Sequence, residues 1–315
     1  MMLAGGIVAV YSNDGTLYAL HATDGSVAWT YKTGGAVEYS VLVANGIVYA
    51  HSDDGTLYAI HAADGALAWK FHSGVTTASP LLVTNDIVYV YATNSILCAL
   101  HADNGTLAWR FATGSFDGSE YIDNPLVVVN DVVYVGSFDY YLYALRATNG
   151  LLVWKFNTGG HIYQAYTVVN GIAYVMSDHF PSSPSYIFYA IHAADGTLAW
   201  KFQPGNIFAS PPVVVGGIVY ADSEDGYVYA IHAADGTLAW KFLTGGTMGG
   251  TPAVANGVVY SISADGYLYA NHATDGTLAW KFFSGNENNY FDSPTVANEL
   301  VYAVSGDGYL DAVAT

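Results

Sequence analysis

The sequence predicts an all-β fold, an eight-bladed β-propeller of four-stranded antiparallel blades in which the last blade lacks its outer strand. Seven tryptophans recur at separations of 40, 40, 45, 46, 40 and 40 residues, and each lies in a near copy of a segment such as DGTLYAIHAADGALAWKF. No ten-residue stretch has helical spacing, whereas apolar and polar residues alternate as they do in strands. A period near forty with four short strands is typical of a propeller blade.

Each repeat contains four predicted strands, named A to D in chain order. In the third repeat these are Pro80–Val83, Ile87–Ala92, Ile96–His101 and Thr106–Phe111. They are rich in Val, Tyr, Leu and Trp and are bounded by Gly, Asp and Asn, as strands usually are. Asp-Gly pairs recur at the B–C and C–D turns. They predict two-residue hairpins, because both central residues of such a hairpin need a positive φ.

The chain ends explain why there are eight B–C hairpins but seven tryptophans. Residues 2–6 align with the end of strand A of the second repeat, and the chain stops after strand C of the eighth repeat, at Thr315. We therefore expect residues 1–315 to form one propeller domain. The strand Tyr309–Val313 would then have an open edge with Asp311 as its only charge. Either this edge is tolerated, or a strand from another chain or a removed segment completes it by β-augmentation.

Composition excludes several classes of partner. The chain has 8 basic and 26 acidic residues, a formal charge of −18. Six of the basic residues directly follow six of the seven repeated tryptophans, so they are dispersed, whereas nucleic acid and anionic membranes require clustered cations. Cationic partners are favoured instead. The sequence has no signal peptide and no apolar run long enough to cross a membrane, and it leaves the localisation open.

Two repeated features invite a metal-site interpretation. Six histidines share one repeat position: His21, His61, His101, His192, His232 and His272. They would lie about a blade apart, too far for the ~2 Å bonds of a shared ion, so we expect them to brace the C–D turns. Calcium needs about six converging oxygens, which the Asp-Gly turns do not supply. The lone Cys98 excludes a disulfide framework and is expected to be a buried apolar residue. No metal site is predicted.

Departures from the repeat mark the predicted functional face. Relative to the forty-residue unit, insertions occur at 115–124 before strand A of blade 4, at 178–185 between strands B and C of blade 5, and at 286–292 before strand A of blade 8. Because successive strands alternate in direction, all three insertions fall on one face. Loops on a rigid scaffold are where binding sites are usually built.

Residues near the start of the innermost strands form the predicted ligand-binding set around the channel mouth. These are Glu38, Tyr39, Tyr121, Asp123, Tyr163, Gln164, Tyr290 and Asp292. Such carboxylates, an amide and aromatic rings suit a sugar, an amine, a cationic side chain or a divalent ion. The alternative is a solvated rim with aromatic packing.

The repeat resembles that of pyrroloquinoline-quinone-like propellers, the eight-bladed quinoprotein superfamily, whose pattern reads roughly A-x-D-x-x-T-G-x-x-x-W. Ala19, Gly25 and Trp29 match this pattern, whereas His21 stands in place of the family's Asp and Asp24 in place of its Thr. The resemblance implies that each tryptophan docks against the neighbouring blade, and burial with a partnered indole N–H supplies the physical reason. It is also compatible with an extracytoplasmic origin.

Three classes of function follow. We favour a non-catalytic scaffold that binds a partner protein or small ligand on the inserted face, in the manner of the family's assembly-scaffold members. A hydrolase or lyase that uses Asp123 and Asp292 is the alternative. A quinone-dependent dehydrogenase is least favoured, because resemblance to that class requires a vicinal disulfide, a calcium-held carboxylate and longer loops. No cofactor is therefore predicted.

Overall fold

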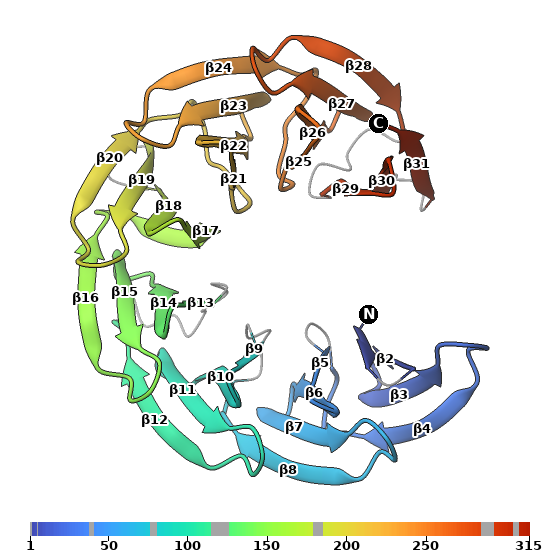
Figure 1. Ribbon diagram of the computed structural model, residues 1–315. Coiled ribbons are helices and arrows are strands. Elements are labelled where there is room, and N and C mark those ends of the chain that lie inside the picture. The colour runs from blue at the N-terminus through green and yellow to red at the C-terminus, as the bar shows by residue number, and fades with distance from the viewer. Residues whose placement is uncertain are drawn as a thin grey trace. The chain divides into compact units, whose positions relative to one another are not determined.

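The computed structural model confirms the all-β prediction. It describes residues 2–4, 6–37, 41–75, 81–114, 126–178, 185–284, 293–304 and 309–315, and of residues 2–4 and 163–165 only the backbone. Within these residues the chain forms seven antiparallel sheets of four strands and one of three, and no helix (Figure 1). The strands of each sheet lie side by side in chain order, from strand A to strand D. Each sheet is one blade.

The described residues fall into two compact units. Unit 1 comprises Met1–Asp139 and Tyr143–Trp154. Its first three blades are β1 (Met2–Ala4), β2 (Ile7–Tyr11), β3 (Thr16–His21), β4 (Val27–Lys32); β5 (Val41–Ala44), β6 (Ile47–Ser52), β7 (Thr56–His61), β8 (Leu67–His72); and β9 (Leu81–Thr84), β10 (Ile87–Ala92), β11 (Ile96–His101), β12 (Leu107–Ala112). Blade 4 contributes residues to both units and consists of β13 (Val127–Val129), β14 (Val132–Gly136), β15 (Tyr141–Arg146) and β16 (Leu152–Asn157).

Unit 2 comprises Tyr140–Leu142 and Lys155–Thr315. Its blades are β17 (His161–Val169), β18 (Ile172–Asp178), β19 (Tyr186–His192), β20 (Leu198–Phe202); β21 (Val213–Val215), β22 (Ile218–Asp222), β23 (Tyr227–His232), β24 (Leu238–Leu243); β25 (Ala253–Ala255), β26 (Val258–Ile262), β27 (Tyr267–His272), β28 (Leu278–Phe283); and β29 (Thr295–Ala297), β30 (Leu300–Val304), β31 (Leu310–Ala314). The last blade has three strands, as predicted.

Strands B and C form the core of each blade. In blade 3 they have the predicted bounds, and the four central residues of each six-residue strand are buried. Residues on both faces of blade 3 are buried because it packs between blades 2 and 4, whose contacts with it include the Trp69–Ala102 and Trp109–Ala147 hydrogen bonds, so its strands contain continuous apolar runs. In strand D at most the tryptophan is buried, as in β8, where the other five residues are exposed or partly exposed, which is the pattern of an outer strand.

The turn chemistry differs from the prediction. At the described B–C hairpins that contain Asp-Gly only the glycine has a positive φ, as in Gly15 at 83° and Gly55 at 77°, and the preceding aspartates do not. The Gly15 N–H donates to the Ser12 carbonyl, so the loop is a type I turn followed by a left-handed glycine rather than a two-residue hairpin. Two consecutive positive φ values occur at A–B turns, for example at Asn45-Gly46, and at one B–C hairpin without Asp-Gly, at Asn94-Ser95 of blade 3.

The tryptophans dock on the following blade, as the resemblance implied. In five of the seven tryptophans the indole N–H donates to a carbonyl beyond strand C of the next blade, in the pairs Trp29–Ala62 (2.8 Å), Trp69–Ala102 (2.9 Å), Trp109–Ala147 (2.7 Å), Trp200–Ala233 (2.9 Å) and Trp240–Ala273 (3.0 Å). A left-handed glycine lies beneath the ring, and a methyl group at Gly105 would lie 2.6 Å from Trp69. The docked side chain thus requires glycine at this turn.

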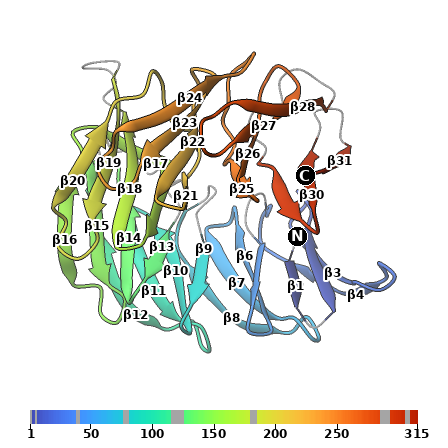
Figure 2. The same ribbon diagram turned by 45° about the horizontal axis from the view of Figure 1, so that its top comes forward.

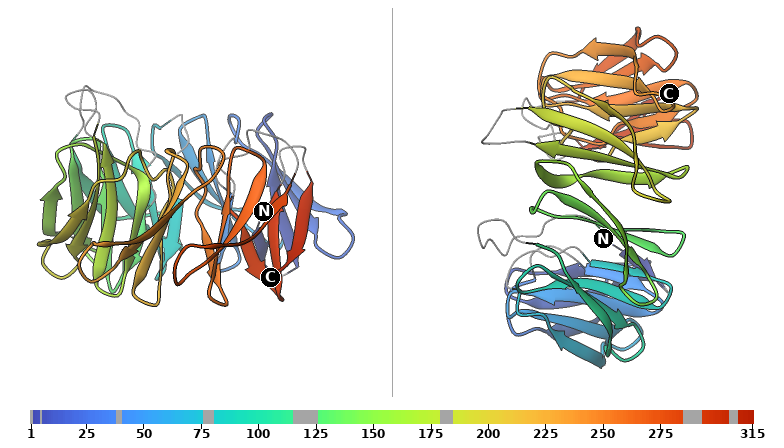
Figure 3. Two further views of the ribbon diagram at one scale, coloured as in Figure 1. Left: turned by 90° about the horizontal axis from the view of Figure 1, so that it is seen from above. Right: turned by 90° about the vertical axis from the view of Figure 1, so that its left-hand side faces the viewer.

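Each blade has two ends at which its strands are connected, and these can be followed in the turned views of Figures 2 and 3. At one end, called the loop end, the D→A connections meet the B–C hairpins, and the Thr33 hydroxyl donates to the Gly15 carbonyl at 2.7 Å. At the other, the turn end, the A–B and C–D turns meet, and the Ala22 N–H donates to the Gly6 carbonyl at 2.7 Å. The connections that carry the three insertions all leave their blades at the loop end.

Candidate functional site

The predicted ligand-binding set lies largely outside the described residues. This is so for Glu38, Tyr39, Tyr121, Asp123, Tyr290 and Asp292. Tyr163 and Gln164 belong to β17, but their side chains are not described. The structure therefore leaves the grouping of these eight residues as a prediction.

Blade 5 is built differently at its loop end. Its inner strand β17 has nine residues, whereas the other described inner strands have three or four. The extension pairs His161 with Asp178, and the register shifts between Ile162 and Tyr166. Gln164 therefore lies between the two paired stretches of β17. The sequence signal for this extension was the six-residue insertion in the following hairpin. The insertion lengthens strands B and C, and the added backbone N–H and C=O groups of strand B can then pair with a longer strand A.

The hairpin aspartates at the loop end are engaged in structural hydrogen bonds. One carboxylate oxygen accepts the hydroxyl of a strand C tyrosine in the pairs Asp54–Tyr58 (2.6 Å), Asp139–Tyr143 (2.5 Å), Asp225–Tyr229 (2.6 Å) and Asp265–Tyr269 (2.5 Å). The other oxygen of Asp54 accepts the Thr56 N–H at 2.9 Å. The preceding blade joins this network through Gly114, whose N–H donates to Asp139 at 2.8 Å. These carboxylates therefore serve turn and interblade structure, as the turn interpretation of the Asp-Gly pairs predicted.

The predicted bracing role of the six histidines is wrong. Each of them lies exposed at the end of strand C, and no imidazole of the set has a hydrogen bond among the described residues. The brace is instead the following aspartate: Asp24 accepts both the N–H and the hydroxyl of Ser26, at 2.9 and 2.7 Å. The backbone bond from Ser26 is the main reason that the pKa of Asp24 is lowered. A short carboxylate reaches the turn N–H better than an imidazole does.

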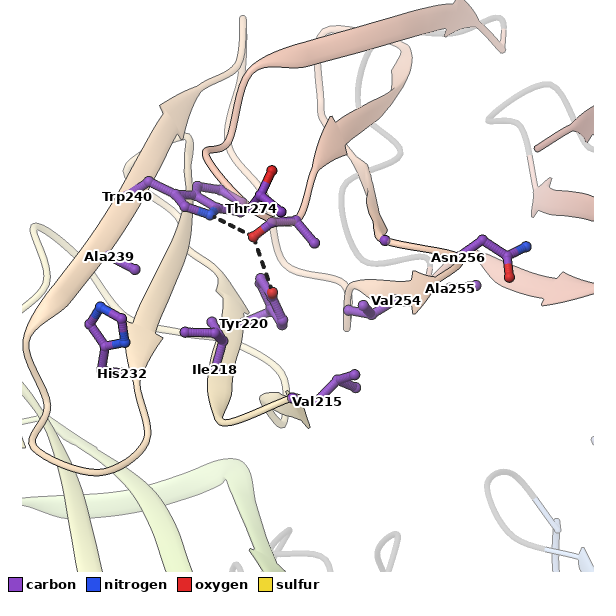
Figure 4. Close-up of a pocket in the computed structure, with 13 residues that line it drawn as sticks. Val215, Ile218, Tyr220, His232, Ala239, Trp240, Val254, Ala255, Asn256 and Thr274 are labelled. Carbon is purple, nitrogen blue, oxygen red and sulfur yellow. Dashed lines mark hydrogen bonds between the residues drawn. The ribbon is translucent and has the colours of Figure 1, made fainter.

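Two equivalent grooves lie at the turn end, one in each unit, and each lies between two neighbouring blades of its unit. The groove between blades 6 and 7 has a volume of about 430 Å³, and that between blades 2 and 3 about 550 Å³. In the first, the Tyr220 hydroxyl and the Trp240 indole both donate to the Ala273 carbonyl, at 3.3 and 3.0 Å (Figure 4). The Tyr220 hydroxyl, the Trp240 indole N–H and the Ala273 carbonyl are thus already engaged in the docking of one blade on the next. The sequence analysis missed these grooves because it considered departures from the repeat, whereas they arise from the repeat itself.

One further position varies between blades without any insertion. It is the fifth residue of strand B, occupied by His51 in blade 2 and by Asp222 in blade 6. Both side chains are buried, and each has a hydroxyl neighbour: His51 and Ser73 lie 2.9 Å apart, and Ser261 donates to Asp222 at 2.8 Å. The second oxygen of Asp222 has no hydrogen-bond partner among the residues that the structure describes. Burial raises the pKa of Asp222 well above its ordinary value and lowers that of His51, so both side chains are favoured in their neutral forms.

Cys98 is buried in strand C of blade 3, as predicted. Burial raises the pKa of its thiol to about 11, so the reactive thiolate is disfavoured. Because the chain has one cysteine, it cannot form the vicinal disulfide of a quinone site, and the residues do not fit that cofactor.

Among the described residues, no three His, Cys, Asp or Glu side chains come close enough to hold a metal ion. No membrane-spanning helix is found in the described part of the chain.

Comparisons with known proteins agree with this architecture. A family model described as outer membrane protein assembly factor BamB matches residues 1–178, 94–206, 139–250 and 183–315. The crystal structure of BamB from Moraxella catarrhalis is similar over 99% of this chain and 95% of that chain, with a TM-score of 0.72 and 19% identity. The computationally designed Ika8 protein is similar over 100% and 95%, with a TM-score of 0.71 and 16% identity.

A quinohemoprotein alcohol dehydrogenase, ADHIIG from Pseudomonas putida HK5, is similar over 98% of this chain and 69% of that chain, with a TM-score of 0.63 and 17% identity. No sequence among the curated proteins matches significantly. At these identities the structural matches establish the fold alone, and that fold is the predicted β-propeller of quinone-type repeats.

Proposed function

Because this chain belongs to the family of the outer membrane protein assembly factor BamB, we propose that it is a non-catalytic scaffold that binds a partner protein at its loop end. The observation that carries the proposal is the family match, whose four segments together span the chain. The positions of the insertions support the choice of face, since 115–124, 178–185 and 286–292 all belong to loop-end connections. A net charge of −18 favours a cationic segment on the partner.

We propose in addition that the eight blades close into one ring over residues 1–315. Eight described sheets and the match to BamB over 99% of the chain support this arrangement. A crystal structure with seven blades, or with two separate domains, would contradict it.

The enzymatic alternatives receive no support from the described residues. The hydrolase or lyase hypothesis rests on Asp123 and Asp292, which lie outside them. The hairpin aspartates are held by tyrosine hydroxyls and backbone N–H groups, so they do not provide a free acid–base pair.

Paired charge variants test the proposed face. The probe is a synthetic lysine-rich peptide, titrated by calorimetry against the wild type, an Asp123→Asn/Asp292→Asn variant and a control, Asp103→Asn/Asp131→Asn. The control removes the same number of charges from exposed turn-end positions. We expect at least fivefold weaker binding for the first pair, less than twofold for the control, and unchanged melting temperatures. Equal weakening would show that net charge alone attracts the peptide, and a lower melting temperature for the first pair with unchanged binding would assign a structural role.

A further inference from the structure

Two acidic side chains at the loop end of unit 2 take no part in the turn network described above. Asp178 ends β18 in blade 5, and Glu224 lies in the B–C hairpin of blade 6. They occupy the same repeat position, directly after a buried serine. The corresponding residue is Phe138 in blade 4 and Ala264 in blade 7, so the hairpin itself does not require a carboxylate there.

Neither carboxylate is neutralised within the described part of the chain. Asp178 is 9% exposed, and its Oδ1 is buried and accepts no hydrogen bond from any described residue. Burial also raises the pKa of the Glu224 carboxyl, and no lysine or arginine of the described residues forms an ion pair with either group. A buried carboxylate oxygen without a donor is costly, so it calls for a partner that the described residues do not provide.

The packing of unit 2 brings the two carboxylates to one connection, which runs from β20 to β21. Met176 lies in the core cluster that joins blades 5 and 6, and Asp178 lies two residues, about 7 Å, farther along the same side of β18. Tyr186, which pairs with Asp178, and Ile207, in the connection, both pack against that cluster. The Ile207 carbonyl accepts the Glu224 N–H at 3.1 Å. Asp178 and Glu224 therefore border the same connection at the loop end.

We propose that Asp178 and Glu224 together bind one cationic side chain of the partner, a lysine ammonium or an arginine guanidinium. The inference rests on the proposed function, and it names the residues that recognise the cationic segment. The net charge of −18 attracts a cation, and the low exposure of Asp178 strengthens an ion pair because little water competes for the charge. The described residues add no third His, Cys, Asp or Glu ligand, so an organic cation suits the pair better than a metal ion.

Single and double substitutions test whether the two carboxylates act on one cation. The probe is the lysine-rich peptide, titrated by calorimetry against the wild type, Asp178→Asn, Glu224→Gln, the double variant and a control, Asp53→Asn. Asp53 has the same repeat position in blade 2, but the neighbouring blades have Asn13 and Thr93 there, so it lacks a paired carboxylate. We expect about tenfold weaker binding for each single variant and less than about twofold for the control. The double variant should be no more than about twofold weaker than the single variants, because both groups bind one cation.

The melting temperature distinguishes a binding role from a structural one. Without peptide, Asp178→Asn should melt above the wild type, because the substitution removes a buried charge that has no partner. Saturating peptide should raise the melting temperature of the wild type more than that of the double variant. A lower melting temperature for Asp178→Asn, or equally weakened binding for Asp53→Asn, would overturn the proposal.

The Asp123→Asn/Asp292→Asn variant separates this inference from the proposed function. Weaker binding by that variant, together with undiminished binding by Asp178→Asn/Glu224→Gln, would keep the loop end as the binding face and overturn the carboxylate pair. No saturable binding to the wild type would overturn the proposed function and this inference with it. Stabilisation by millimolar calcium that the double variant lacks would make the pair a metal site and would also overturn the inference.

Discussion

Asp222 shows how a near-perfect repeat makes single residues informative. The corresponding position holds Met176 in blade 5 and Ile262 in blade 7, so the fold itself accepts an apolar side chain there. Asp222 is 2% exposed and has one hydroxyl donor, Ser261, which is too little to offset the loss of water around a charged carboxylate. Its raised pKa follows from this burial. The sequence analysis did not select it, because an aspartate at the end of a strand is usually exposed.

We predict that Asp222→Asn reduces the dependence of stability on pH. The carboxyl group keeps its proton longer in the folded state than in the unfolded state, where its pKa is about 3.9. The free energy of unfolding therefore falls as pH rises from about 4 to the folded-state pKa, by about 1.4 kcal/mol per pH unit from this group. Asparagine resembles the neutral acid and has no such penalty. Urea unfolding of both proteins from pH 4 to 8 should show the variant gaining relative stability as pH rises.

The exposed Asp103→Asn variant serves as the control, since it removes a carboxylate without relieving burial. Parallel stability curves for the wild type and Asp222→Asn over this pH range would refute a protonated, buried Asp222.

At the scale of the strand and turn, the sequence was most reliable where one interaction decides the structure. The bounds of β10 and β11 agree with the prediction because their apolar runs end sharply at turn residues. The prediction of two-residue hairpins at the Asp-Gly pairs was wrong. Asp-Gly is compatible both with a two-residue hairpin and with a type I turn followed by a left-handed glycine, so the residue pair alone does not decide between them. The deciding feature is the aspartate carboxylate, which accepts the N–H two residues later, as from Asp54 to Thr56, and needs no positive φ.

The tryptophans permit a matched prediction about blade docking. The Trp240 indole donates to the Ala273 carbonyl at 3.0 Å, whereas Trp280 is half-buried and its indole has no hydrogen-bond acceptor among the described residues. Both side chains pack against a strand B tyrosine, Tyr220 or Tyr260, at nearly equal centroid distances of 5.9 and 5.8 Å. Trp240→Phe should therefore lower the free energy of unfolding by about 1 kcal/mol more than Trp280→Phe, the value of one buried hydrogen bond. Chemical denaturation of the two variants measures the difference, and equal losses would contradict the docking account.

At the scale of the whole molecule, the repeat defines the scaffold while the candidate site lies where the repeat is interrupted. Strand order within a blade and tryptophan docking follow from local interactions that recur from blade to blade and were predictable from one unit. The grouping of Glu38, Asp123, Gln164 and Asp292 was not, because the positions of loop side chains depend on contacts that occur once in the chain. The extension of β17 is an example: only the paired lengthening of β18 and β19 explains it.

The central claim is that the loop end is the binding face and that the turn end is structural. Hydrogen–deuterium exchange of the chain with and without the lysine-rich peptide tests this directly, because it reports protection along the backbone. We predict protection in 115–124, 178–185 and 286–292, with no change in the C–D turns such as 61–66 and 232–237. Protection confined to the C–D turns would contradict the account and move the binding site to the turn-end grooves.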